Sequence, residues 1–305
     1  MRAALPPGRA SRPVRFASRP CAACTLRGFT LIEMVVTIAV GAVVVAFMAM
    51  FIVLPMTAYT AQTRRAGLVD ASDSALRFMA RDIRGALPNS VRVAASGTVT
   101  ALELLATADG ARYQDNGPVS NPALVLDFTT ADGAFATTVP FTQLTLPFSS
   151  TLYYLAIYNV GVPGADAYQM MNVITPRGTT ITVAAGATSN QNLVTLNPPF
   201  QFAYGSPEKR VFLVSGPVSY LCDTSAGTLT RYSGYTISST QPTSAIALSS
   251  AGAASALVAA NVASCSFTYS TGTAQRNALA TLSVQIAQSG ESVQLLNEVQ
   301  VVNAP

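Results

Sequence analysis

Three residues at the start of an apolar stretch could take part in chemistry. Gly28 ends a basic segment, and Phe29 would become a new N-terminus if the chain were cut between the two. Glu33 is a lone carboxylate about one helical turn further on. A charge in a membrane helix costs about 2.5–3.5 kcal/mol at its centre and less near an end, so such residues are usually paired or functional. Glu33 is therefore expected to have a partner; the alternative is that it only reaches back to the membrane interface.

The apolar stretch that follows is long enough to cross a bilayer. Residues 34–54 carry no charge, and 21 residues at about 1.5 Å each span roughly 30 Å of hydrocarbon. The segment before it holds six arginines and no acidic residue, which predicts that it stays in the cytoplasm while the C-terminal part is exported. These arginines are Arg2, Arg9, Arg12, Arg15, Arg19 and Arg27. If the chain is cut between Gly28 and Phe29, the cut precedes the apolar run, which would then be kept as an anchor, unlike a secretory signal.

The four cysteines fall into two pairs. Cys21 and Cys24 form a CxxC in the basic segment, where we interpret them as incidental because no second pair and no histidine accompany them. Cys222 and Cys265 lie in the exported part, where an oxidising compartment favours a disulfide. That bridge would close a loop of 44 residues and stabilise the fold by about 4 kcal/mol in the chain-entropy estimate. The alternative is two reactive or metal-binding thiols, for which the sequence offers no partner.

Other kinds of chemistry lack the residues they require. The chain has no histidine, no serine-centred elbow motif, no phosphate loop and no clustered carboxylates, so we predict no enzyme, no metal site and no cofactor. The net charge of +4 comes from the leader, because the remainder carries 12 basic and 14 acidic residues. No basic stripe with interleaved aromatics exists in the exported part, so no nucleic-acid partner is expected.

A second helical segment follows the span. Val69, Leu76, Met79, Ile83 and Leu87 recur at helical spacing and predict one buried face. Asp73 and Arg77 form an i,i+4 pair, and Arg81, Asp82 and Arg84 are expected on the solvated surface. A kink is plausible at Pro55, and Pro88 should end the helical pattern.

From residue 89 onward, short runs rich in Val, Thr, Tyr and Leu are broken by Gly, Pro, Asn and Ser, which predicts an antiparallel β domain. The expected strands are 101–107, 123–129, 152–159, 180–184, 211–215, 266–270, 279–287 and 293–302, with a hairpin over 218–235 that turns at Ser225-Ala226-Gly227. Residues 130–150, 185–191 and 236–260 are expected to be surface loops. The predicted fold class is α+β: a long N-terminal helix, membrane-spanning in its first half and amphipathic in its second, packed on an antiparallel sheet.

The motif Arg27-Gly28-Phe29-Thr30-Leu31-Ile32-Glu33-Met34 resembles the cleavage and methylation site of type IV prepilins and of the pseudopilins of type II secretion. The resemblance implies that prepilin peptidase cuts between Gly28 and Phe29 and that the new amine is methylated. It also implies that Glu33 pairs with the N-terminal amine of a neighbouring subunit during assembly. The expected partners are therefore the peptidase and methyltransferase, other major and minor pilin-like subunits, and the inner membrane.

Later segments are similar to the MshO proteins, which are minor pilin-like subunits of mannose-sensitive haemagglutinin pili. These segments are Arg81-Asp82-Ile83-Arg84, 86–93, Val218-Ser219-Tyr220-Leu221-Cys222-Asp223, Leu229-Thr230-Arg231-Tyr232, Tyr235 and Val301-Val302-Asn303-Ala304-Pro305. They also resemble the J-type subunits of type II secretion and the W-type subunits of type IV pili. Residues 94–210 match no family pattern.

The resemblance implies four regions: a cleaved leader at 1–28, a membrane helix at 29–56, an amphipathic helix at 57–88 and an exported β-rich domain at 89–305. It implies a minor subunit that primes a filament or sits at its tip. Two alternatives remain open: a J-type secretion pseudopilin, and an adhesin whose middle segment contacts a ligand. The low content of charged residues, 10% of the chain, suits a subunit that buries surface against partners.

Overall fold

The structure is a computed structural model that describes residues 28–116, 124–188, 190–272 and 276–301. The chain divides into two compact units, residues 1–59 and residues 60–305. Helix α1 (Leu31–Arg84) supplies the described helix of the first unit and continues into the second. The leader cysteines Cys21 and Cys24 lie outside the described residues.

In the second unit, α1 buries one face against strands. The buried positions recur three, four or seven residues apart, as one helical stripe requires: Leu68, Ser72, Ala75, Leu76, Met79, Ala80 and Ile83. The prediction of a buried Val69 was wrong, because Val69 is 40% exposed and Leu68 takes that position. Arg77 and Asp73 form the predicted ion pair at 2.6 Å.

The helix ends earlier than Pro88 predicts. Arg84 is its last residue, and Gly85 donates the last α-type hydrogen bond, to the Arg81 carbonyl at 3.1 Å. Leu87 then donates its backbone N–H to Leu105 at 2.7 Å, as a strand residue would. Leu87 is buried, as predicted, but beyond the helix and in a separate cluster with Leu105 and Tyr154. Pro55 lies inside α1, and the chain is helical on both sides of it.

The β domain contains two antiparallel sheets within the described residues. The larger has ten strands, with the order β10-β9-β8-β2-β3-β7-β6-β4, while β1 pairs with β2 and β5 with β8; the smaller has the order β11-β12-β13. The strands are β1 (Arg92–Ser96), β2 (Val99–Tyr113), β3 (Asp132–Val139), β4 (Phe148–Ser150), β5 (Tyr154–Ala156), β6 (Thr180–Ala185), β7 (Asn192–Phe200), β8 (Arg210–Asp223), β9 (Thr228–Ser233), β10 (Ala254–Ala260), β11 (Val262–Ser270), β12 (Ala278–Gln288) and β13 (Glu291–Val301). Two short helices, η2 (Ala167–Gln169) and α2 (Ala245–Ser250), lie in the connections.

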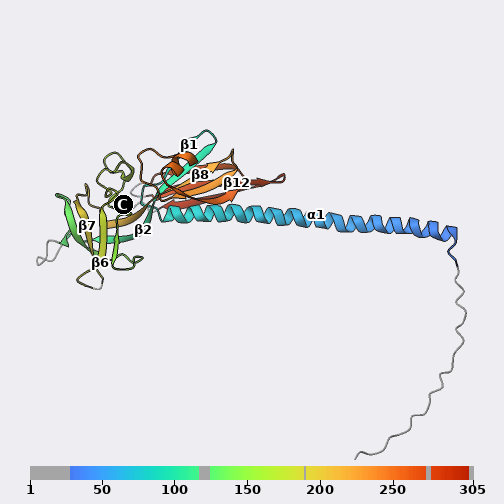
Figure 1. The fold of residues 1–305 in the computed structure, drawn as a ribbon, viewed down its shortest axis with the longest axis horizontal. Helices are drawn as coiled ribbons and strands as arrows, with labels where there is room; N and C mark the ends of the chain where they lie inside the picture. The colour runs from blue at the N-terminus through green and yellow to red at the C-terminus, as the bar shows by residue number, and fades with distance from the viewer. Residues whose placement is uncertain (1–27, 117–123, 189, 273–275, 302–305) are drawn as a thin grey trace, which may run out of the picture. The chain divides into compact units, whose positions relative to one another are not determined.

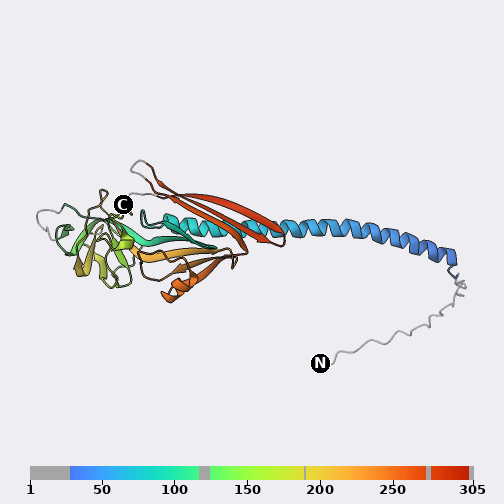
Figure 2. The same cartoon turned by 90° about the horizontal axis from the view of Figure 1, so that it is seen from above.

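Two large apolar clusters stabilise this domain. The helix core joins Met79 and Ile83 of α1 to β2, β8 and the three C-terminal strands. Figures 1 and 2 show those C-terminal strands, drawn in orange and red, lying along the cyan part of α1. The distal core gathers Tyr113, Phe135, Phe202 and residues of β6, β7 and β8. Strands β2 and β8 contribute to both cores, which they connect.

The structure confirms the α+β class and most of the predicted strands. Strand β8 is continuous where two separate strands were predicted, and its Gly216 has φ +127°, a conformation that suits glycine. The predicted strand at 152–159 is reduced to Tyr154–Ala156. The predicted hairpin is present, with β9 following β8.

Three predictions in the β domain were wrong. Residues 124–129 form no strand, because the Asp127 carboxylate accepts hydrogen bonds from the Thr129 N–H and hydroxyl and from the Thr130 hydroxyl, all at 2.7 Å. The expected loop at 130–150 contains β3 and β4. The expected loop at 236–260 contains α2 and β10. Strand β7 was missed.

Candidate functional site: the junction before the membrane helix

The junction between Gly28 and Phe29 lies just outside helical structure. Residues 28–30 are exposed and precede α1, which begins at Leu31. A Cβ built on Gly28 would meet nothing within 4 Å. The fold of the chain therefore does not require glycine at position 28. A requirement for glycine there would come from a protein that binds the junction.

Thr30 and Glu33 form the start of the helix. The Glu33 N–H donates to the Thr30 hydroxyl at 3.3 Å, and the Met34 N–H donates to the Thr30 carbonyl at 3.1 Å. Thr30 is thus the N-cap, and Thr-x-x-Glu is the pattern of a capping box. The carboxylate of Glu33 also lies in the first turn, where the helix dipole favours a negative charge. This local role was missed from the sequence, although the Thr-x-x-Glu spacing signals it.

The helix that follows exposes its apolar side chains. In the first unit, every residue from 31 to 53 is exposed, including Phe47, Phe51 and Ile52. By length and composition, α1 is the one helix among the described residues that could cross a membrane. These features are consistent with membrane anchoring, because so much apolar surface needs a lipid or protein environment.

In the β domain, a disulfide joins Cys222 of β8 to Cys265 of β11. It connects the large sheet to the C-terminal sheet beside the helix core. Over the described stretches of the chain, no group of three or more His, Cys, Asp or Glu residues is arranged to hold a metal ion.

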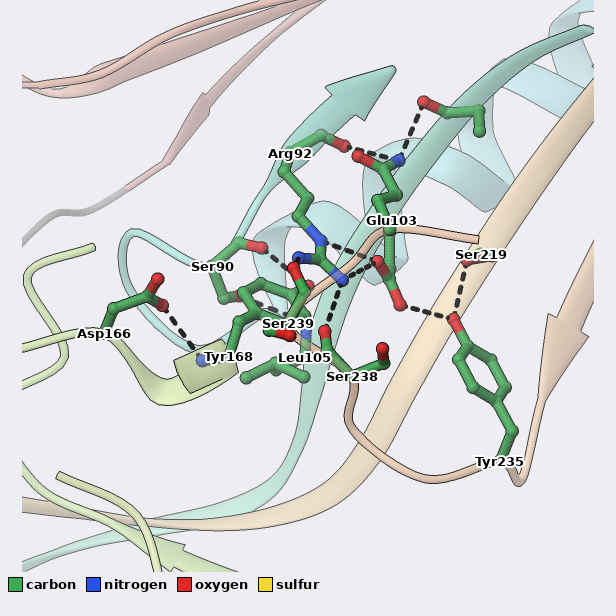
Figure 3. A network of polar contacts seen from close by, with 12 residues as sticks. Ser90, Arg92, Glu103, Leu105, Asp166, Tyr168, Ser219, Tyr235, Ser238 and Ser239 are labelled. Carbon is green, nitrogen blue, oxygen red and sulfur yellow. Dashed lines mark hydrogen bonds and ion pairs between the residues drawn. The ribbon is translucent and has the colours of Figure 1, made fainter. Parts of the chain in front are cut away.

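A buried ion pair that the sequence did not reveal joins β1 to β2 (Figure 3). Arg92 of β1 and Glu103 of β2 approach to 2.6 Å, and the Glu103 side chain has no exposed surface. Tyr235 donates its hydroxyl to Glu103 at 2.8 Å. Burial raises the pKa of Glu103, while the Arg92 charge and the Tyr235 hydrogen bond oppose that shift.

Arg92 also holds two loops. Its guanidinium donates to the carbonyls of Ser238 and Ser239, each at 2.8 Å, and lies 3.6 Å from the ring centre of Tyr168. The Tyr168 hydroxyl donates to the Ser90 carbonyl at 2.9 Å. The network (Figure 3) is fully partnered and connects several segments, so its arrangement is that of a structural joint.

A second unpredicted pair joins α1 to the sheet. Asp82 was expected on the solvated face, but its carboxylate accepts from Arg231 of β9 at 2.7 Å and from the Tyr220 hydroxyl at 2.8 Å. Burial and the Asp82 charge raise the pKa of Tyr220. The contact fixes the rotation of α1 against β8 and β9.

Comparison with known families finds one match. Residues 27–49 match the prokaryotic N-terminal methylation motif. Together with the long helix packed on an antiparallel sheet, this match supports a type IV pilin-like protein, a class processed by prepilin peptidase. The motif implies contact with that peptidase and with pilin subunits in general. Comparison with curated proteins and comparison with solved structures each gave no match.

Proposed function

We propose that this chain is a minor type IV pilin-like subunit that primes the assembly of a pilus or sits at its tip, in a system of the mannose-sensitive haemagglutinin type. Prepilin peptidase cuts between Gly28 and Phe29, and the new amine is methylated. Helix α1 anchors the product in the inner membrane, with the β domain in the periplasm, until it joins the filament. The observation that carries the proposal is the methylation motif at residues 27–49, whose exposed junction leads directly into an apolar helix.

Two features support a minor role. The β domain has a distal core in addition to the helix core, and such a bulky domain is easier to place at a filament tip than in every layer. The fully buried carboxylate of Glu103 is engaged with Arg92 and Tyr235, and Arg92 in turn holds neighbouring loops. We therefore propose a structural function without catalysis, cofactor or nucleic acid.

A second candidate is an adhesin displayed on the same kind of filament. One observation favours it: the loops around the distal core expose Leu152, Met171 and Tyr204, of which Tyr204 is 47% exposed. Tyr204 lies beside Tyr158, with ring centres 6.0 Å apart. Such a surface could contact a ligand without any change in the assembly role. A J-type secretion pseudopilin would share the same junction and helix.

The test is to shear filaments from cells and to quantify this protein by mass spectrometry in the filament and membrane fractions. We expect an N-methylated peptide beginning at Phe29, in filaments, at far lower abundance than the major subunit. An unprocessed chain found only in membranes would overturn the proposal. Binding of cells to surfaces, compared with and without the gene in a strain that keeps its filaments, separates the adhesin from the assembly role.

A further inference from the structure

Natural sheets usually protect their edges, because unpaired backbone groups invite another strand. Several sheet edges in the described part of this chain are protected, either because the edge strand is short or because an irregularity interrupts its pairing. Strand β4 has three residues. Strand β10 carries a register shift between Leu257 and Ala259, and β11 carries one between Val262 and Ser264.

Strand β13 lacks these protections. Its 11 residues pair with β12 from Glu291 to Val301 without a register shift, and it is the last strand of its sheet. It contains no proline and no lysine. Every second residue of such a strand directs its N–H and C=O away from β12. Apart from the ladder with β12, no backbone hydrogen bond of β13 occurs within the described residues.

A groove of about 950 Å³ lies between this edge strand and α1. Its lining includes Ala66, Val69 and Asp73 of the helix and Leu295 of β13, the strand residue that contributes to it. The groove is therefore placed beside β13, where an added strand would need room for the side chains that face the helix. The lining combines the small or aliphatic residues Ala66, Val69 and Leu295 with charged residues of α1, among them Arg65 and Asp70, so it suits an extended segment that carries both apolar and polar side chains.

We propose that β13 is a strand-addition site that takes an extended segment of another subunit of the filament. This inference rests on the proposed function. The open backbone edge selects an extended polypeptide, because its spacing of donors and acceptors matches a β-strand. On the face away from the helix, Leu296 is 64% exposed and Glu298 has no ion-pair partner within the described residues. The added strand would therefore carry an apolar side chain near Leu296 and a basic one near Glu298.

The test compares two single variants of the full chain in filament-forming cells. Leu296→Lys adds a charge to the open edge of β13. Leu257→Lys is the matched control, because Leu257 is a leucine of almost equal exposure, 63%, on the irregular edge strand β10. We expect Leu296→Lys to lower recovery in sheared filaments about tenfold, because a charged side chain replaces an apolar one at the contact, and Leu257→Lys to leave recovery unchanged. Both side chains are exposed, so thermal unfolding of the detergent-solubilised chains should match the wild type.

A second measurement identifies the occupant. A photo-crosslinking p-benzoylphenylalanine at position 296 should give an adduct with another subunit that carries an N-terminal methylation motif, and position 257 should not. Equal recovery of the two lysine variants would overturn the proposal, as would adducts formed only with lipid or with a second copy of this chain. The wild type is quantified in the same filaments: its absence there would count against the proposed function, whereas its presence with equal variants would count against strand addition alone.

Discussion

At the scale of single residues, Glu33 has two separable roles. Its position three residues after the cap Thr30 stabilises the helix start, and its charge is what the proposed pairing with a neighbour's amine requires. Glutamine serves in a capping box as well as glutamate does, but it carries no charge. The two roles can therefore be tested one at a time.

We expect Glu33→Gln to reduce incorporation into filaments several-fold, because the buried amine would lose its counter-charge. Membrane insertion should stay intact. Thr30→Ala is the control: it removes the cap at a cost of about 1 kcal/mol but keeps the carboxylate, so incorporation should be affected less. Both are measured by quantitative mass spectrometry of sheared filaments and membranes. Normal incorporation of Glu33→Gln would argue against the pairing role.

Gly28 offers a test of processing that does not disturb the fold. Since a Cβ at Gly28 meets nothing within 4 Å, Gly28→Leu should leave helix and domain unchanged yet keep the leader attached, as seen by the mass of the membrane-bound chain. Gly41→Leu, at a glycine with equally open surroundings, should be processed normally. A shortened Gly28→Leu product would mean that the cut lies elsewhere.

At the scale of elements, the sequence predicts the helices and strands whose apolar residues recur at regular spacing. The helix face was found through Leu76, Met79 and Ile83, but heptad spacing assigned Val69 where Leu68 is buried. Strand β7 was missed because Pro198 and Pro199 usually exclude a strand. Both prolines are tolerated because they fall where β7 is unpaired. The pairing of β7 with β6 ends at Asn197, and its pairing with β3 has no partners between Thr195 and Phe200. The Arg92–Glu103 pair could not be predicted, because it depends on β1 folding back on β2.

The helix face gives a quantitative prediction. Met79 is fully buried in the helix core, so Met79→Ala should lower the free energy of unfolding by about 3 kcal/mol. Val69→Ala, at a 40% exposed site on the same helix, should cost less than about 1 kcal/mol. Denaturant unfolding of the detergent-solubilised full chain measures both. Equal losses would show that the face is wrongly assigned.

At the scale of the whole molecule, the Arg92 network joins β1 and β2 to the loops that hold Tyr168 and Ser239. We expect Arg92→Met to lower the free energy of unfolding by about 3 kcal/mol at pH 7, because it leaves a buried carboxylate without its cation. Arg112→Met is the control. Its partner Glu208 is 53% exposed and 3.3 Å away, so the loss should stay below about 1 kcal/mol.

The same variant has a defined pH dependence. The folded-state pKa of Glu103 is raised above its unfolded value of 4.5, so its stabilising contribution is complete below pH 4.5 and is lost as the pH rises through the folded pKa. Without Arg92 that pKa rises further. The deficit of Arg92→Met should therefore shrink between pH 7 and pH 5, as measured by denaturant unfolding at both values. A deficit independent of pH would show that Glu103 is not the group left uncompensated.

Strands β2 and β8 have a consequence for how the domain comes apart. They pair from Val99↔Asp223 to Arg112↔Arg210, a run that begins at the helix core and ends at the distal core. Because both strands belong to both cores, unfolding of one core disrupts the strands on which the other core depends. Residues 60–305 should therefore lose their structure in a single calorimetric peak, and backbone amides of β2 and β8 near both cores should share one slow hydrogen-exchange rate set by global opening.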